Sequence, residues 1–378
     1  MSAEVQAYRD GGVGRIVLDR PRAINSLTHD MITAVRAALE GWAADDAVRA
    51  VVLTGTGERG LCAGADIRAL HDDAKAGGAG ARAFFRAEYG LNALIARYPK
   101  PYLAVMDGIT MGGGVGLSAH GSVRIVTERS VVAMPETRIG LVPDVGGSRL
   151  LARAPGETGT HLGLTSGSMG PGDALFCGFA DHFVPSAQIP GLLDALTRDT
   201  DLTAAGVTAA VAGHAATAPP AALAAQREWI DACYAAGTVE EIVERLFAHG
   251  LPEAKEAAEQ LLGNAPTAVK VTLAALRRAR ALPSLEAVLD QEYRVSCHAL
   301  TTPDLVEGIR AQVVDKDRSP RWSPADPAGV TEADVERFFA PREGDELGLA
   351  GPARSAPVRR PSGPACGPGT VGAAPADS

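Results

Sequence analysis

The chain has 378 residues, enough for one large domain or two ordinary ones. Hydrophobic residues make up 46% of it and aromatic residues only 4%, so the composition predicts a core of aliphatic side chains. The formal net charge of −9 argues against a nucleic-acid partner, because phosphate binding requires a basic face. It leaves room for a local basic pocket that binds an anionic small molecule.

The five cysteines lie at positions 62, 177, 233, 297 and 366, and no pair has the spacing of a metal site or a redox motif. An odd number of scattered cysteines favours a reducing compartment without a disulfide framework. The first nine residues lack a basic start followed by an apolar run, and no apolar run reaches the length of a membrane span. We therefore predict a cytoplasmic protein without a bound metal ion.

The first half of the sequence alternates short apolar runs with helical patterns. Residues 13–18 and 48–54 are predicted strands, and Thr28 is placed to cap a helix that continues to about residue 44. A loop over 60–67 leads into a helix, and a further helix is predicted over 82–97. Two more predicted strands, 101–106 and 123–127, flank a glycine-rich turn. This order predicts a layered α/β domain.

From about residue 191 the sequence becomes helical and rich in alanine, with breaks at Pro219, Pro252 and Pro266. A helical pattern covers 284–312, and Thr331 is placed to cap a short last helix. After residue 341 the small residues and proline dominate, and such a segment cannot bury enough apolar surface to offset its ordering entropy. We predict three parts: a core over 5–190, a helical region over 191–341 and a disordered tail over 342–378.

Two short motifs place bare backbone at the start of a predicted helix. Cys62-Ala63-Gly64-Ala65-Asp66 follows one strand, and Gly112-Gly113-Gly114 follows another. The first N–H groups of a helix have no partner within that helix. Two such ends that converge would form an oxyanion hole, which stabilises the negative oxygen of an acyl-transfer intermediate. A glycine triplet equally serves close packing of a helix on a strand, and the triplet alone leaves both interpretations open.

Two acids stand in a mostly apolar stretch. Glu136 and Asp144 are the only acidic residues over 129–156, and burial in such surroundings raises the pKa of a carboxyl group and tunes it for chemistry. Taken alone, each of the two could instead cap a helix. Glu88 lies within a predicted helix, where a solvated acid is the simpler interpretation.

Taken together, these motifs resemble the enoyl-CoA hydratase/isomerase (crotonase) superfamily, and within it the 3-hydroxyisobutyryl-CoA hydrolase branch. The resemblance covers roughly residues 5–340. It continues through residues 266–272 and 307–310 and through the segment 315–324, which is typical of that branch and not of short hydratases. It implies an α/β fold, a spiral of repeated ββα units followed by a C-terminal helical region, and an acyl-CoA substrate.

The resemblance also implies roles for single residues. The backbone N–H groups of Ala65 and Gly113 are expected to form the oxyanion hole, Glu136 to be the catalytic glutamate, and Asp144 to be the aspartate that distinguishes the hydrolases. The further residues expected to contact the substrate are Glu88, Gly64, Asp66, Ile67, Gly112, Gly116 and Arg22. Arg22 and the nearby Arg20 would meet the phosphates of CoA, although a surface role is the alternative for both.

The implied function is hydrolysis of the thioester of 3-hydroxyisobutyryl-CoA, or of a similar short-chain 3-hydroxyacyl-CoA, in valine breakdown. Glu136 would either attack the carbonyl carbon or activate water, and the sequence leaves both routes open. An enoyl-CoA hydratase or isomerase is the alternative, but similar hydratases carry a second glutamate where this chain has Gly116. A non-catalytic acyl-CoA-binding protein is a third interpretation, and the presence of both Glu136 and Asp144 counts against it.

The resemblance implies no cofactor, because CoA is part of the substrate, and it allows a homo-oligomer formed through the C-terminal helices. One departure concerns the acyl group. Residues 148–150 read Ser-Arg-Leu where the hydrolases usually have aromatic residues, so we expect the acyl pocket to differ there.

Overall fold

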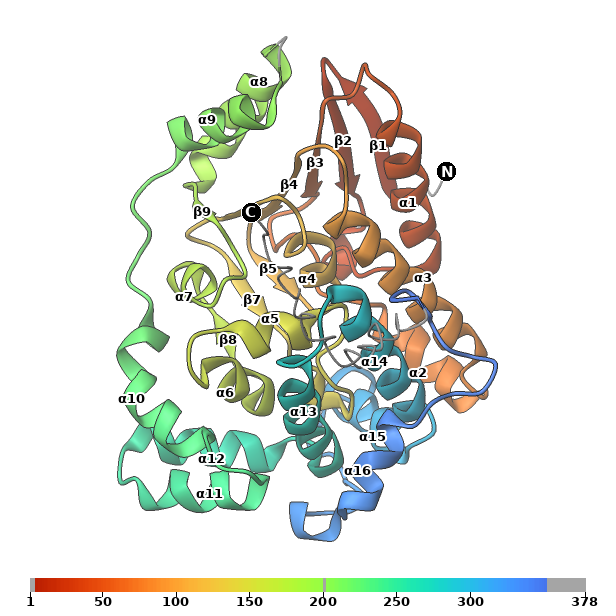
Figure 1. Ribbon diagram of the computed structural model, residues 1–378, viewed down its shortest axis with the longest axis vertical. Helices are drawn as coiled ribbons and strands as arrows, with labels where there is room; N and C mark the ends of the chain where they lie inside the picture. Colours follow the sequence, from red (N-terminus) through yellow and green to blue (C-terminus); the bar gives the residue numbers. More distant parts are fainter. Residues whose placement is uncertain (1–3, 200–201, 352–378) are drawn as a thin grey trace, which may run out of the picture.

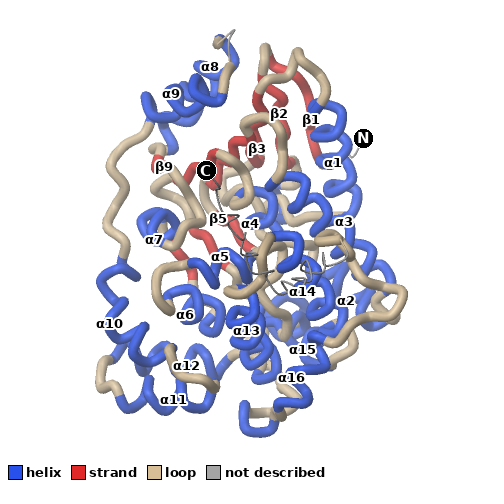
Figure 2. The backbone as a smooth tube through the Cα atoms, in the orientation of Figure 1, coloured by secondary structure: helices blue, strands red, loops and turns tan. Residues whose placement is uncertain are grey.

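A computed structural model describes residues 4–199 and 202–351 of the chain. It contains a six-stranded sheet in the order β1-β2-β3-β4-β6-β9 and a three-stranded sheet in the order β5-β7-β8, with helices around both (Figure 2). The strands of the larger sheet are β1 (Val5–Asp10), β2 (Val13–Leu18), β3 (Ala50–Gly55), β4 (Tyr102–Met106), β6 (Val123–Val126) and β9 (His182–Phe183). Those of the smaller sheet are β5 (Ile109–Met111), β7 (Val131–Ala133) and β8 (Ser168–Met169).

The chain winds as a spiral, and two successive turns of this spiral each supply one strand to the larger sheet, one strand to the smaller sheet and then a helix. β4 leads to β5 and to helix α4 (Gly113–Ser118), and β6 leads to β7, the 3₁₀ helix η2 (Glu136–Ile139) and helix α5 (Gly147–Arg153). Parallel pairing of β4 with β6 and of β5 with β7 stacks these two turns on each other. The structure confirms the predicted α/β spiral of ββα units followed by a helical region.

The larger sheet is covered on both faces. Alternate residues over 50–53 point into one core shared with helix α1 (His29–Ala43) and into a second core shared with helices α8 (Ile189–Arg198) and α9 (Ala204–His214). Successive side chains of a strand point to opposite faces, so a strand covered on both faces requires a continuous apolar run. Although they follow residue 188, α8 and α9 therefore form part of the layering around the sheet.

Local sequence signals set most helix boundaries. The Thr28 hydroxyl accepts a hydrogen bond from the Met31 N–H at 3.2 Å at the start of α1, and Thr331 closes a capping box at the start of the last helix. The predicted helical stretch 284–312 divides into α14 (Leu285–Ala299) and α15 (Pro303–Ile309), because Pro303 fits the first turn of a helix and cannot continue one. The predictions from the sequence missed β1, β5, β7, β8 and β9. The last four have only two or three residues each, which is too few for an alternating pattern.

After α9 the chain runs along one side of the molecule and enters the helical region, which occupies the lower part of Figure 1. Its helices are α10 (Ala222–Tyr234), α11 (Val239–Ala248), α12 (Pro252–Gly263), α13 (Pro266–Ala279), α14 (Leu285–Ala299), α15 (Pro303–Ile309) and α16 (Glu332–Phe339). The remaining helices of the spiral are α2 (Ile67–Lys75), α3 (Ala79–Ala96), α6 (Thr158–Thr165) and α7 (Pro171–Phe176). Among the described residues no helix is long and apolar enough to cross a membrane.

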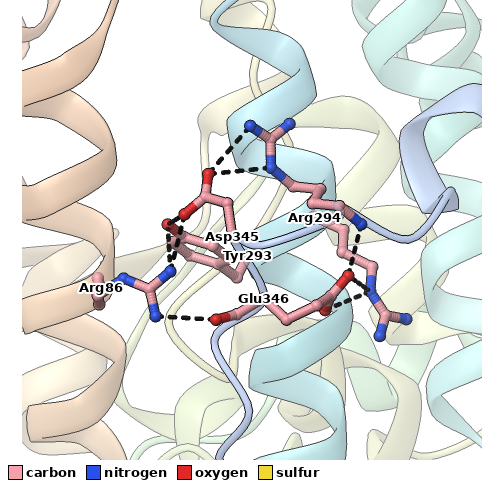
Figure 3. A network of polar contacts seen from close by, with 6 residues as sticks. Arg86, Tyr293, Arg294, Asp345 and Glu346 are labelled. Carbon is pink, nitrogen blue, oxygen red and sulfur yellow. Dashed lines mark hydrogen bonds and ion pairs between the residues drawn. The ribbon is translucent and has the colours of Figure 1, made fainter.

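The predicted disordered tail does not begin where the composition changes. Residues 342–351, which we call the strap, bind to α3 and α14 through side-chain contacts (Figure 3). Arg86 of α3 donates to Asp345 at 2.8 Å and to the Glu346 carbonyl oxygen at 2.9 Å, and Arg294 of α14 donates to the Glu346 carboxylate at 2.8 Å. The strap has too few apolar residues for its composition to predict an ordered structure. Charged residues of α3 and α14 hold it in place instead. Residues 352–378 of the predicted tail lie outside the described residues.

We expect Arg86→Met to lower the free energy of unfolding by about 1–2 kcal/mol, because it removes two hydrogen bonds to the strap and one to Tyr293 of α14, all from half-exposed groups. Urea unfolding measures this change. The control is Arg198→Met, which removes an exposed pair with Asp194 one turn away and should cost less than about 0.5 kcal/mol. Equal effects of the two variants would show that the strap adds nothing to stability.

Candidate active site

The predicted oxyanion hole begins with the backbone of residues 62–66. Leu27 and Ala65 form an isolated parallel bridge, in which the Leu27 N–H donates to the Gly64 carbonyl at 2.8 Å and the Asp66 N–H donates to the Leu27 carbonyl at 2.9 Å. Neighbouring residues of an extended segment direct their N–H groups to opposite sides. Both neighbours of Ala65 therefore face Leu27, while the Ala65 N–H faces away from it, and no described residue accepts a hydrogen bond from this group.

The second donor lies directly opposite. A bridge between Cys62 and Thr110 holds the two loops together, with the Met111 N–H donating to the Cys62 carbonyl at 2.9 Å. A Cβ atom on Gly64 would lie 3.6 Å from the Gly113 nitrogen, and one on Gly113 would lie 3.5 Å from the Ala65 nitrogen. Within the described chain the Gly113 N–H, at the start of α4, has no acceptor either. Two unpaired donors thus converge, as an oxyanion hole requires.

A cavity of about 630 Å³ opens at these donors. Of the predicted site residues, those that line it are Gly64, Ala65, Ile67, Glu88, Gly112, Gly113, Glu136 and Asp144. The rest of its wall comes mainly from α2, η2, α6 and residues 310–314, and it combines apolar side chains such as Leu162 with polar ones such as Ser166 and Gln312. Apolar surface with a few converging polar groups is typical of a small-molecule site.

Glu136 stands against the glycine turn. Its Oε1 atom lies 2.9 Å from the position that a Cβ of Gly112 would take, so a side chain there would displace the acid. Glu136 is 6% exposed and its Oε2 atom has no described partner. Burial, and then the negative charge of Asp144, raise the pKa of Glu136 well above its ordinary value. Although Glu136 opens η2, its side chain makes no capping hydrogen bond, so the capping interpretation is wrong for this residue.

Asp144 lies in the turn between η2 and α5 and is 5% exposed. The Tyr89 hydroxyl of α3 donates a 2.6 Å hydrogen bond to Oδ2 of Asp144, and the Ser296 hydroxyl of α14 lies 2.8 Å from the same phenol oxygen. Burial raises the pKa of Asp144 to about 6, and the hydrogen bond from Tyr89 offsets part of the rise. The side chain does not cap α5 either.

Glu88 faces the site from α3. It is 1% exposed, and its Oε1 atom lies 2.4 Å from the position of a Cβ on Gly113 and has no described partner. Burial and then the charge of Asp144 raise the pKa of Glu88 well above its ordinary value. The interpretation as a solvated helical acid is therefore wrong. Glu88 and Glu136 lie on either side of the glycine turn, and with Asp144 they form a coupled set of acids that titrate together.

We expect Glu88→Gln to make stability less dependent on pH. The folded pKa of Glu88 is raised above its unfolded value of about 4.3, so the stability from its proton is complete below that value and is lost as pH rises through the folded pKa. Glutamine carries no such proton. In urea unfolding at pH 5, 6.5 and 8, the variant should gain stability relative to the wild type as pH rises. Parallel pH curves would contradict the burial of an ionisable Glu88.

Three of the predicted substrate contacts do not line the cavity. Asp66 is instead engaged by Arg20, whose guanidinium donates to it at 2.8 Å, and it caps α2. Gly116 packs inside the protein, where a Cβ would lie 2.7 Å from Cβ of Val145 and 2.8 Å from Nδ2 of Asn92. Intramolecular partners occupy both positions, so a substrate contact at either one stays a prediction.

Arg22 is exposed on the surface outside the cavity, so its contact with a CoA phosphate stays a prediction. None of residues 148–150 lines the cavity, so the expected difference of the acyl pocket from that of the hydrolases stays a prediction. The cavity wall does contain Arg138, an exposed residue whose guanidinium has no partner within the described chain.

The sequence also missed Tyr89 as a partner of Asp144 and missed Glu292 of α14. Glu292 is 1% exposed and accepts hydrogen bonds from the turn that follows Asp144. The sequence did contain a signal for a buried acid, because Glu292 interrupts the apolar stripe formed by Val288, Leu289 and Val295. Over the described residues no group of histidine, cysteine and acidic side chains is arranged to hold a metal ion.

Comparison with known proteins gives consistent results. A family model described as enoyl-CoA hydratase/isomerase matches residues 13–339. The protein named 3-hydroxyisobutyryl-CoA hydrolase, mitochondrial, is 41% identical in Danio rerio over 92% of this chain and 92% of that protein. The human protein of the same name is 38% identical over 89% of this chain and 88% of its own length.

Two crystal structures share the fold over nearly the whole chain. One, a protein described as a carnitinyl-CoA dehydratase from Mycobacterium thermoresistibile, has a TM-score of 0.88 and 53% identity over 93% of this chain and all of its own. The other, described as an enoyl-CoA hydratase from Rhodobacter sphaeroides, has a TM-score of 0.85 and 44% identity over 91% of this chain and 99% of its own. All of these names describe enzymes of acyl-CoA compounds, but they differ in the reaction.

Proposed function

Because the chain belongs to the enoyl-CoA hydratase/isomerase family, we infer that its two unpaired backbone donors and its buried acids act on an acyl-CoA thioester. The protein is an acyl-CoA thioester hydrolase. It hydrolyses the thioester of 3-hydroxyisobutyryl-CoA, or of a similar short-chain 3-hydroxyacyl-CoA, to the free acid and CoA. This reaction is consistent with a step of valine degradation.

The observation that favours hydrolysis over hydration is the pair formed by Asp144 and Gly116. Hydration of a double bond by two acids that share a water requires the second acid at position 116. In this protein Val145 and Asn92 fill the space that such a side chain would need. The acid beside Glu136 is Asp144 instead, fixed by Tyr89. Hydration is the second candidate because the two crystal structures described above carry hydratase and dehydratase names.

In the mechanism that we propose, the N–H groups of Ala65 and Gly113 bind the thioester carbonyl oxygen and stabilise the negative charge that develops on it. Each such donor is worth about 2.7–4 kcal/mol in the transition state of other acyl-transfer enzymes. Glu136 either adds to the carbonyl carbon and expels the thiolate, giving a mixed anhydride that water cleaves, or removes a proton from the attacking water. Asp144 orients the water or assists protonation of the thiolate.

A single turnover in ¹⁸O-water tests the anhydride route. If the anhydride forms and water cleaves it at the protein carbonyl, one ¹⁸O atom enters the Glu136 carboxyl group. Direct attack by water leaves Glu136 unlabelled, as does cleavage of the anhydride at the substrate carbonyl, so only incorporation of the label identifies a route. Mass spectrometry of the peptide that contains Glu136 reads the outcome.

The function itself is tested by the release of thiol from (S)-3-hydroxyisobutyryl-CoA by the purified protein, with hydration of crotonyl-CoA measured in parallel. Rapid release of CoA with negligible hydration is the expected result. Hydration without release of CoA would contradict the hydrolase and favour the second candidate.

Three further properties belong to this proposal. The enzyme works without a bound cofactor, because each step above uses only side chains, backbone donors and water. Helices of the C-terminal region offer the surface for a homo-oligomer. The location is the cytoplasm, as the scattered cysteines predict, although the vertebrate relatives are named as mitochondrial proteins.

A further inference from the structure

The turn that carries Asp144 has a backbone conformation that its own sequence does not favour. Val145 has a φ of 52°, in the left-handed region, where a β-branched side chain is strained by about 1–3 kcal/mol. Such a conformation persists only where surrounding groups impose it. The surroundings of residues 144–148, which we call the aspartate turn, should therefore contain the groups that hold it.

Helix α14 supplies the main hold. The two carboxylate oxygens of Glu292 accept the Gly146 N–H at 2.7 Å, the Ser148 N–H at 3.0 Å and the Ser148 hydroxyl at 2.5 Å. His120 adds a fourth contact, since its Nε2 lies 2.7 Å from the Val145 carbonyl oxygen and donates to it. Burial lowers the pKa of His120 to about 4, so the ring is neutral and carries its proton on this nitrogen.

The same helix also reaches the other side of Asp144. Ser296 follows Glu292 by one helical turn, and its hydroxyl lies 2.8 Å from the Tyr89 oxygen that donates to Asp144. One face of α14 therefore fixes both the backbone that carries Asp144 and the phenol that orients its carboxylate. Glu292 itself is buried and does not line the cavity, so it cannot touch the substrate.

We propose that Glu292 is a positioning residue for thioester hydrolysis: it holds the strained aspartate turn so that Asp144 meets Tyr89 and faces the cavity beside Glu136. The inference rests on the proposed function, since it assigns Glu292 to the reaction through Asp144. It explains why an acid stands on the apolar face of α14, where burial without these donors would be costly.

The test compares Glu292→Gln with Asp290→Asn in the purified full-length protein. Asp290 is a matched control, because it lies on the same helix and its carboxylate also accepts hydrogen bonds from two backbone N–H groups. These groups belong to Leu349 and Ala350 of the strap and not to the aspartate turn. Glutamine has one acceptor oxygen, and its NH2 group can only donate. It therefore cannot accept hydrogen bonds from Gly146 and Ser148 on two separate atoms, and the turn loosens. We expect kcat to fall about 10- to 100-fold with little change in KM, while Asp290→Asn keeps its kcat.

If Glu292 acts through Asp144, the effect of Glu292→Gln on kcat should depend on the presence of Asp144. A merely structural role would give no such dependence. In an Asp144→Asn background, Glu292→Gln should change the residual kcat by less than about twofold, because both substitutions then act on the same lost function. Tyr89→Phe should show the same loss of effect in that background. Effects that multiply, or a Glu292→Gln enzyme with unchanged kcat, would overturn the inference.

If Glu292→Gln fails to fold, Ser148→Ala takes its place, since it removes only the hydroxyl bond to Glu292. Its expected fall in kcat is smaller, and it too should vanish in the Asp144→Asn background. Failure of the proposed function can be told apart from failure of the inference about Glu292. A wild type that releases no CoA refutes the proposed function and the inference with it, whereas an active wild type and a fully active Glu292→Gln refute the inference alone.

Discussion

Replacing Glu136 with glutamine should lower the rate of thioester hydrolysis by about 10²–10⁴-fold while the protein stays folded. Glutamine has nearly the same shape, but it can neither attack the carbonyl carbon nor take a proton from water. Stability should be equal or higher, because the substitution removes a buried acid whose pKa is raised by burial and by the charge of Asp144. Thiol release measures the rate, and thermal unfolding confirms the fold.

The control for this variant is Asp304→Asn. Asp304 is also buried, burial raises its pKa to about 6, and one of its oxygens has no described partner, but it does not line the cavity. It should keep its rate within about twofold of the wild type. Near-normal hydrolysis by Glu136→Gln would remove Glu136 from the mechanism, and a comparable loss in Asp304→Asn would show that burial of an acid, rather than its place in the cavity, controls the rate.

Gly113→Ala should have the second large effect, a loss of about 10²–10³-fold in kcat. The new methyl group would lie 2.4 Å from Oε1 of Glu88 and 3.0 Å from Cδ1 of Leu27, so either the glycine turn or Glu88 must move. Any movement of the turn takes the Gly113 N–H away from the Ala65 N–H and breaks the convergence that binds the carbonyl oxygen. Steady-state kinetics on the same thioester separates the loss in kcat from any change in KM.

Gly41→Ala is the matched control for this steric test. Gly41 lies in α1, and a Cβ there would have no atom within 4 Å. The substitution should leave the rate unchanged and raise stability by about 0.5–1 kcal/mol, because alanine favours a helix more than glycine does. A Gly113→Ala enzyme with full activity would show that the carbonyl oxygen does not bind at this turn.

The predictions from the sequence succeeded where the signal was local. Strands β2, β3, β4 and β6 and many of the helices follow from apolar spacing, capping residues and prolines, which act over a few residues. The glycine motifs and the acids Glu136 and Asp144 stand out for the same reason, since their immediate neighbours mark them, whereas Glu88 was assigned to the site by the resemblance alone. The resemblance carried by these motifs then supplied the fold and the reaction, because it adds spacing over the whole chain to each local signal.

The sequence could not show contacts that depend on a distant partner. Asp66 and Gly116 belong to the right motifs, yet Arg20 engages the first and the packing of Val145 and Asn92 surrounds the second. The strap has a disordered composition, but residues far away in the sequence bind it, with Arg86 and Asp345 separated by 259 positions. Composition cannot reveal such partners.

The sequence by itself determined many of the helices and the strands β2, β3, β4 and β6, which backbone segments are bare and which acids are available for chemistry. Only the tertiary structure decided how these acids act. It brings Tyr89 to Asp144 across 55 positions and Glu292 to Gly146 across 146 positions, and it buries the acids so that their pKa values rise. The physical reason is that burial and contact are properties of packed segments, whereas propensity and capping are properties of neighbours along the chain.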